Sequence, residues 1–340
     1  MDDASYGKRD KRGNWTPFDR IEYPPVFVWP IQPLGLLKWL FGASGYILPW
    51  NLFFAAVGIT LWALLTPSLE TMRTFGLGWI LYLLARNAAL TFIVFGFFHM
   101  RLYTQRAQGA MFKYNGKWLD RDNPAFLFRN QTIDNMIWAF ASGVPIWTAY
   151  EVVTLWAFAN GYIPMLSWQA HPVGFVALML AIPLFREAHF YLIHRLIHWP
   201  PLYRTVHNLH HNNVNPGPWS GLAMHPVEHL LYFSGVLVHW VIPSHPIHAL
   251  FHLVHAGLSP VPGHTGFEKV VVGENSAVDT HCYAHYLHHK YFECNYADGA
   301  IPLDKWFGTF HDGSEESHEA MNARFMARAA KLAAGSGKGV

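Results

Sequence analysis

Long apolar runs are the feature of this sequence that most limits its fold. Residues 47–66 are twenty residues without a charge, enough for a helix to cross a hydrocarbon core of about 30 Å. Similar runs occupy residues 76–103, 136–159 and 172–199, the last becoming charged and His-rich in its second half. The runs predict an all-α integral membrane protein with about four transmembrane helices, the fourth continuing into water.

The composition agrees with a membrane protein. Hydrophobic residues make up 52% of the chain and charged residues 14%, against about 25% charged in soluble domains. Residues 230–258 are also apolar but broken by Pro243 and Pro246, which predicts a helical hairpin dipping into the bilayer or an imperfect pair of spans. Because the basic residues are scattered rather than gathered in one patch, a nucleic-acid partner is not expected.

The charges on the connections predict an orientation. The N-terminal tail and the loop 104–135 are rich in Lys and Arg, whereas the connections 67–75 and 160–171 are poor in them. The positive-inside rule then places the N-terminus, this loop and the His-rich region in the cytoplasm, as a helical cap on a bacterial inner membrane or endoplasmic reticulum protein. The polar N-terminus does not resemble a signal peptide, and Cys282 and Cys294 are not expected to form a structural disulfide there.

Two charges interrupt the apolar runs. Arg86 lies in the second run and Glu151 in the third, and because these spans are antiparallel both charges sit at a similar depth of roughly 15 Å. An unpaired charge at that depth costs about 2.5–3.5 kcal/mol. We therefore predict an ion pair between Arg86 and Glu151, with Glu187 and Arg186 of the fourth run as competing partners.

Histidine is the residue type in this sequence that most indicates a chemical function. The chain has 22 histidines, and most of them lie between His189 and His289. HRLIH (194–198), HNLHH (207–211) and HYLHH (285–289) repeat short helical offsets. Since positions i, i+3 and i+4 share a helix face, several imidazole nitrogens of one group can reach the same metal ion.

The grouping indicates a metal centre rather than scattered interfacial histidines. Any single histidine is more simply explained as decoration of a membrane interface, but three groups with ligand spacing are not. Eight or more imidazoles exceed the three to five protein ligands that one catalytic ion usually takes, so two ions are implied. Iron can activate dioxygen toward a C–H bond of a lipid, whereas zinc has no redox chemistry.

These groups resemble the histidine boxes of the fatty acid hydroxylase (sterol desaturase) superfamily of membrane di-iron oxygenases. MHPVEH (224–229), GHTGF (263–267) and PLDKWFGTF (302–310) resemble that family's neighbouring elements. The resemblance implies two iron ions, O2 as co-substrate, a lipid substrate and a separate electron donor of ferredoxin or cytochrome b5 type with its reductase. The ligands that it implies are His194, His198, His207, His210, His211, His264, His285, His288 and His289, with His189 and His225 as weaker candidates and Glu228 as an orienter of a ligand imidazole.

The expected division of the chain follows from the spans and from this resemblance. Residues 1–46 form a cytoplasmic tail and interfacial segment, 47–135 the first two transmembrane helices and a cytoplasmic loop, 136–310 the fatty-acid-hydroxylase-like catalytic region, and 311–340 a C-terminal tail ending in a disordered GSGKGV. These parts make one functional domain.

The expected activity is hydroxylation of a C–H bond of a sterol, acyl or other lipid, and the alternative is desaturation at the same di-iron site. Two remote alternatives are a metal transporter and an inactive lipid-binding relative. A transporter would spread its histidines over several spans at mid-membrane depth, and an inactive relative would have broken boxes.

Overall fold

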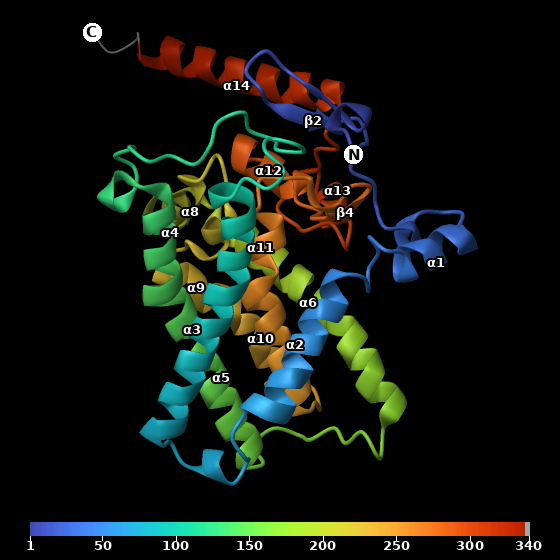
Figure 1. Cartoon of the computed structure of the whole chain (residues 1–340), viewed down its shortest axis with the longest axis vertical. Helices are drawn as coiled ribbons and strands as arrows, with labels where there is room; N and C mark the ends of the chain where they lie inside the picture. Colours follow the sequence, from blue (N-terminus) through green and yellow to red (C-terminus); the bar gives the residue numbers. More distant parts are fainter. Residues whose placement is uncertain (337–340) are drawn as a thin grey trace.

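The computed structural model describes residues 1–336 and is mostly helical (Figure 1). The longer helices are α2 (Trp50–Leu65), α3 (Leu77–His99), α5 (Val144–Ala159), α6 (Pro172–Ile197), α10 (Pro246–Leu258) and α14 (Glu315–Ser336). The shorter helices are α1 (Pro33–Phe41), α4 (Gln131–Trp138), α7 (Pro200–Leu202), α8 (Asn208–His211), α9 (Pro226–Phe233), α11 (Pro260–Gly263), α12 (Tyr283–Tyr291) and α13 (Leu303–Trp306). The last four residues of the GSGKGV end lie outside the described part.

The described structure is not the purely α-helical one that the sequence predicts, because it also contains two small antiparallel β-hairpins. Strands β1 (Gly7–Arg9) and β2 (Trp15–Pro17) form one, and β3 (Lys269–Gly273) and β4 (Ser276–Asp279) form the other. Each strand has only three to five residues, too short for the alternating pattern of a strand to stand out in the sequence.

Three helical segments of the described chain are long and apolar enough to cross a membrane: Leu77–Thr104, Gln131–Ala159 and Pro172–Ile197. The first includes a π-helical turn after α3, and the second joins α4 to α5 through another. The first predicted span corresponds to α2, which has 16 residues and is shorter than the ~20 that a perpendicular span needs. The count of four spans therefore stays a prediction.

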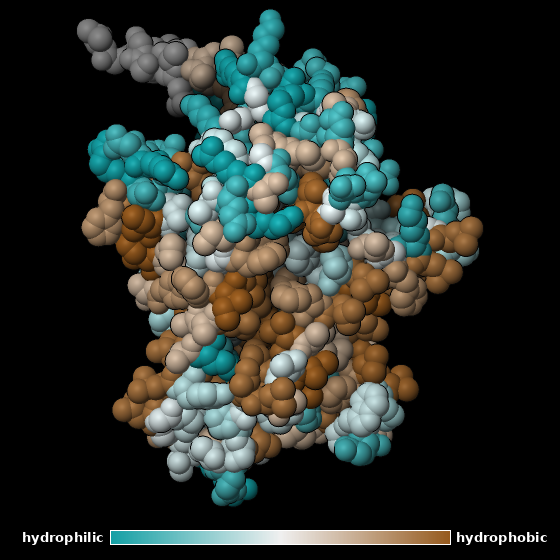
Figure 2. Space-filling model, in the orientation of Figure 1, coloured by the Kyte–Doolittle hydropathy of each residue, from teal (hydrophilic) through white to brown (hydrophobic). Residues whose placement is uncertain are grey.

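Apolar side chains cover the outside of these helices. On the face that Figure 2 shows, they form a brown band across the helical part, while teal side chains gather at the end that holds α12 and α14. Leu77 and Val173 are among the most exposed large hydrophobic residues. This distribution inverts the usual arrangement of a water-soluble protein and suits helices surrounded by lipid.

Helix α10 lies among α2, α5 and α6 and fills the centre of the helical part. Gly58 allows its close approach to α2, since a Cβ at that position would lie 2.9 Å from the Cα of Phe251. Small residues at such crossings let two helices pack backbone to backbone. Upstream of α10, helix α9 leads into a 3-10 helix, Ser234–Trp240, and a turn, so the predicted helical hairpin is observed. Its depth in a bilayer stays a prediction.

The polar end is a layer of short elements rather than two loose tails. Trp15 of β2 is buried against Phe112 and Tyr114, which ties the N-terminal hairpin to the loop 104–135, and α12 belongs to the same apolar cluster. Helix α14 lies across the outside of this layer (Figure 1), within the region expected to be a tail. Cys282 and Cys294 are both free and buried.

Candidate metal centre

Three helical segments bring the histidine boxes together. HRLIH occupies the last turn of α6, which ends at Ile197 with His198 as its C-cap. Trp199 has an extended backbone between α6 and α7, and Pro200 and Pro201 lack the N–H groups that a continuing α6 would need. HNLHH then runs through a π-helical turn into α8, and HYLHH lies on α12.

The nine predicted ligands form two separate groups. One contains His194, His198, His207, His211 and His288, and the other contains His210, His264, His285 and His289. Within each group one ligand nitrogen of every residue lies within 4.8 Å of the others. All nine side chains belong to buried residues except His198, which is half-buried.

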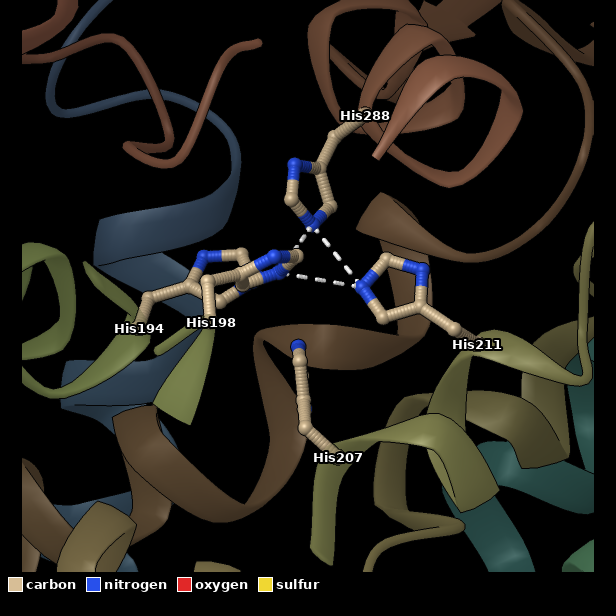
Figure 3. A group of neighbouring side chains, drawn as sticks. All are labelled: His194, His198, His207, His211 and His288. Atoms are coloured by element: carbon tan, nitrogen blue, oxygen red, sulfur yellow. Dashed lines mark hydrogen bonds between the residues drawn. The ribbon is translucent and has the colours of Figure 1, made fainter. Parts of the chain in front are cut away.

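The first group closes around a point between three chain segments (Figure 3). The Nε2 atoms of His198, His211 and His288 form a triangle with sides of 3.1–3.2 Å. His207 Nε2 is buried and has no hydrogen-bond partner. Imidazole nitrogens therefore converge on one centre from α6, α8 and α12.

The second group has the same character. His264 Nε2 lies 2.9 Å from His285 Nε2, 3.3 Å from His289 Nε2 and 3.4 Å from His210 Nε2. His264 follows α11 directly and supplies the ligand from outside the three boxes.

Each of the two later boxes is divided between the groups. His207 and His211 face the first group, whereas His210 faces the second; His288 faces the first, whereas His285 and His289 face the second. The sequence argument lets two or three imidazoles of one box reach the same metal, because their positions share a helix face. The structure shows that α8 and α12 each border both centres, because a helix lying between two sites presents neighbouring positions to each.

The hydrogen bonds of the Nδ1 atoms, which face away from the centre of each group, show which ring nitrogen carries the proton. Nδ1 contacts a backbone carbonyl oxygen in His194 (Tyr296, 2.7 Å) and in His288 (Cys294, 2.7 Å). In His264 the partner is the Pro260 oxygen at 2.8 Å. A carbonyl only accepts, so Nδ1 carries the proton in these rings and Nε2 presents a lone pair.

Converging lone pairs fit a cation. Two unprotonated Nε2 atoms at 3 Å cannot hydrogen-bond to each other, and protonating them would bring positive charges together in a buried place. Burial and the neighbouring imidazole of His264 lower the pKa of His210 to about 3, and burial lowers the pKa of His264 to about 4. The rings are therefore neutral at ordinary pH, the form in which imidazole binds a metal.

Glu228 contacts a ligand ring in the first group. Its Oε1 lies 2.8 Å from His207 Nδ1, so the carboxylate holds the proton of His207 on the nitrogen that faces away from the other histidines. Glu228 Oε2 is buried without a partner, and burial raises the pKa of this carboxyl well above its usual value. A nearby cation would reverse that preference by favouring the carboxylate.

The two weaker candidates lie outside both groups. His189 Nε2 is 3.1 Å from Ser234 Oγ. His225 is the N-cap of α9, where its Nδ1 accepts from the Val227 N–H. The backbone acceptors that orient His194 and His288, at Tyr296 and Cys294, were not identified from the sequence, because a carbonyl is present at every residue and leaves no signal.

A cavity of about 1500 Å³ reaches the histidines. His194, His207, His210, His264 and His285 border it, and so does Glu228. Its other walls include residues of α6, of α2 and of the N-terminal segment before α2. The space is large enough for a lipid-sized molecule.

Comparison with known proteins agrees with the histidine boxes. Residues 179–309 match the family described as fatty acid hydroxylase. A Delta(7)-sterol 5(6)-desaturase of Candida glabrata is 27% identical over 176 residues, covering 50% of this chain and 47% of the relative. Enzymes of the same name from Gibberella zeae (32% identical, 37% of this chain, 39% of the relative) and Saccharomyces cerevisiae (30%, 37% and 34%) also match. No solved structure matches the chain.

The matched segments span less than half the length of these three relatives. The segment that matches the family, residues 179–309, contains all nine histidines of the two groups. Residues 179–309 therefore match a fatty acid hydroxylase domain, and the chain is similar to the sterol desaturases named above.

Proposed function

We propose that this chain is a membrane-bound di-iron oxygenase that hydroxylates a C–H bond of a lipid with O2. The observation that carries the proposal is the pair of histidine groups, five and four imidazoles, at the wall of one lipid-sized cavity. Two bound irons would supply the redox chemistry that oxidises an unactivated C–H bond, which zinc at the same nitrogens would not.

The residues of the chain itself have three tasks in this reaction. The carbonyls of Tyr296, Cys294 and Pro260 fix ring orientation through the Nδ1 protons. Glu228 does the same for His207 and adds a negative charge that offsets the charge of the metals. The cavity wall holds the lipid at the histidines and excludes bulk water.

The reaction needs electrons from outside. Hydroxylation consumes one O2, two electrons and two protons and releases one water, while desaturation makes the same demand and releases two. A separate ferredoxin or cytochrome b5 with its reductase is therefore proposed as partner. The loop 104–135, with its exposed Arg106 and Lys117, offers a positively charged face for that partner.

Desaturation is the second candidate. The names of the relatives, Delta(7)-sterol 5(6)-desaturases, favour it and favour a sterol among the substrates. Hydroxylation and desaturation both begin by removing a hydrogen, and the position of the substrate decides which follows. The metal-transporter alternative is disfavoured because the histidines gather at one end of the helices, and the inactive relative because all nine histidines converge.

The deciding experiment is product analysis. The iron-loaded chain in lipid nanodiscs is supplied with O2, reductant and a total lipid extract, and products are identified by mass. A lipid that gains one oxygen supports hydroxylation, and one that loses two hydrogens supports desaturation. The His211→Ala variant serves as the control. Absence of any product that depends on O2, on iron and on His211 would contradict the proposal.

The proposed topology has four spans and a cytoplasmic histidine end. Cys282 is buried and cannot report it, so the test uses two exposed positions, Lys117→Cys and Tyr162→Cys. An impermeant maleimide added to intact bacterial cells is expected to label only Tyr162→Cys. Labelling of Lys117→Cys from outside would reverse the orientation.

A further inference from the structure

The segment before α2 exposes an apolar surface to its surroundings. In residues 23–69 the only charged residue is Lys38, and Trp29 and Leu34 are 85% and 83% exposed. The large apolar side chains exposed on this segment are Val26, Phe27, Val28, Trp29, Ile31, Leu34, Leu37 and Phe41. An exposed apolar surface of this kind marks an interaction site.

Part of this apolar surface is one face of helix α1. Leu34, Leu37 and Phe41 are three and four residues apart and share one face, and the exposed Lys38 lies beside them. Figure 1 shows α1 projecting sideways near the upper end of α2, and Figure 2 shows brown atoms there at the edge of the apolar band. The face is thus continuous with the surface that the candidate spans present to lipid.

The residue types are those of a membrane interface. Trp is enriched at the level of lipid headgroups, and a Lys can rest its stem on apolar groups while its charge stays in water. An amphipathic helix with Lys beside Leu and Phe binds in the plane of the interface. Lipid covers such a face without a second protein.

Another side of the same segment borders the cavity. Gln32, Gly35 and Trp39 line it together with Lys38, which lies between the two sides, and the cavity extends from them to histidines of both groups. The far end of the segment is attached to α6, because the Tyr46 hydroxyl donates to the Leu180 oxygen at 2.6 Å. One short helix therefore separates the lipid-facing surface from the space in front of the histidines.

We propose that residues 29–41 lie in the interface of the bilayer leaflet on the histidine side and form the mouth through which an amphiphilic lipid moves sideways from the bilayer into the cavity. The membrane contact is independent of the reaction. The passage of a substrate rests on the proposed function, because it assumes that the cavity receives a lipid.

The membrane contact is tested by quenching. A fluorophore is attached to Leu34→Cys, and for comparison to Met326→Cys, an exposed apolar position on α14. Both native cysteines are buried, and the labelled wild-type chain sets the background. In nanodiscs the label at 34 is expected to be quenched by doxyl-labelled lipid and protected from aqueous iodide. The label at 326 is expected to be quenched by iodide and not by the doxyl-labelled lipid. Quenching at 34 by iodide, or protection there from both quenchers, which would mean a protein covers it, overturns the proposal.

The mouth is tested by access to the cavity. Ser259 lines the cavity, and its buried Oγ has no hydrogen-bond partner, so Ser259→Cys removes no bond. A membrane-soluble maleimide reports how fast this cysteine is reached. Gly35→Trp narrows the mouth, and a Cβ at position 35 meets its nearest atom, Gln32 Cβ, at an ordinary 3.6 Å.

The expected result is a fall of labelling rate by about tenfold with Gly35→Trp and a change under about twofold with the outward-facing control Leu34→Trp. Trp39→Ala widens the mouth and is expected to raise the rate. If neither Gly35→Trp nor Trp39→Ala changes the rate, the mouth lies elsewhere and the proposal fails. Because labelling and quenching do not require turnover, these outcomes are separate from failure of the proposed oxidation.

Discussion

Arg86 of α3 and Glu151 of α5 form a buried ion pair that joins two of the candidate spans. Asn87 Nδ2 donates to Glu151 Oε2 at 2.9 Å, and Arg86 Nη1 donates to the Leu65 oxygen and to Thr66 Oγ1 at 3.0 and 3.2 Å. The pair predicted from equal depth in antiparallel spans is confirmed. Each charge is both neutralised and hydrogen-bonded, which is what a charge among apolar helices requires.

Removing one member of this pair should destabilise the protein strongly. Glu151→Gln leaves Arg86 buried without a counter-charge, so we expect a loss of about 3–5 kcal/mol, measured by thermal unfolding in detergent micelles. Combining it with Arg86→Met removes the stranded charge and should recover part of the loss. Glu70→Gln, which breaks the exposed pair of Glu70 with Arg73, is the control and should cost under about 1 kcal/mol. A Glu151→Gln effect no larger than this control would contradict the account.

The competing partners considered for that pair are engaged elsewhere. Arg186 pairs with Asp298 and donates to the Tyr232 hydroxyl at 2.6 Å. Glu187 accepts three backbone N–H groups from residues 299–301. Both contacts tie α6 to the chain after α12, more than a hundred residues away, and depth in a span carries no information about such loops.

The two histidine groups should hold one metal ion each. His288→Ala removes a ligand from the first group and His289→Ala one from the second, so each variant is expected to fall from two ions per chain toward one, and the double variant toward none. Metal content by mass spectrometry of the purified chain measures this. His225→Ala is the control and should keep two ions, because His225 caps α9 instead. Loss of an ion in that control, or two ions retained in His288→Ala, would refute the assignment.

Glu228 should matter for metal affinity rather than for folding. Glu228→Gln keeps an oxygen acceptor for His207 Nδ1 but removes the negative charge, so a weakening of metal binding of about 10–100-fold is expected. Chelator competition on the folded chain measures the affinity. Thermal stability of the metal-free variant should change little, and a large loss of that stability without a change in affinity would assign Glu228 a structural role only.

The sequence predicts the parts of this protein that depend on local pattern. Apolar runs locate the candidate spans, and box spacing together with the family resemblance locates all nine converging histidines. The division of HNLHH and HYLHH between two centres was not predictable, because it depends on how α8 and α12 sit between the sites. The folding of residues 1–46 was missed for a related reason: Trp15 packs against the distant residues Phe112 and Tyr114, and a short strand has no pattern of its own.

Glu268 links stability to pH at the polar end of the molecule. Its carboxylate accepts the Tyr114 hydroxyl, and burial, followed by the nearby Asp279, raises the pKa of Glu268 to about 7. The folded state therefore binds a proton more tightly than the unfolded chain, whose Glu pKa is near 4.5. The resulting stabilisation is fully present below pH 4.5, decreases as the pH rises through 7, and is absent above it.

Glu268→Gln should remove this dependence, because the amide is neutral at every pH and its oxygen still accepts from Tyr114. At pH 8 the variant is expected to be more stable than the wild-type chain by up to about 3 kcal/mol, and at pH 5 the difference should fall below about 1 kcal/mol. Thermal unfolding of both chains at the two pH values measures it, and contributions from the histidines cancel because both chains share them. Glu274→Gln, at an exposed position between β3 and β4, should match the wild-type chain at both values. A Glu268→Gln difference of equal size at pH 5 and pH 8 would show that the carboxyl does not titrate in this range.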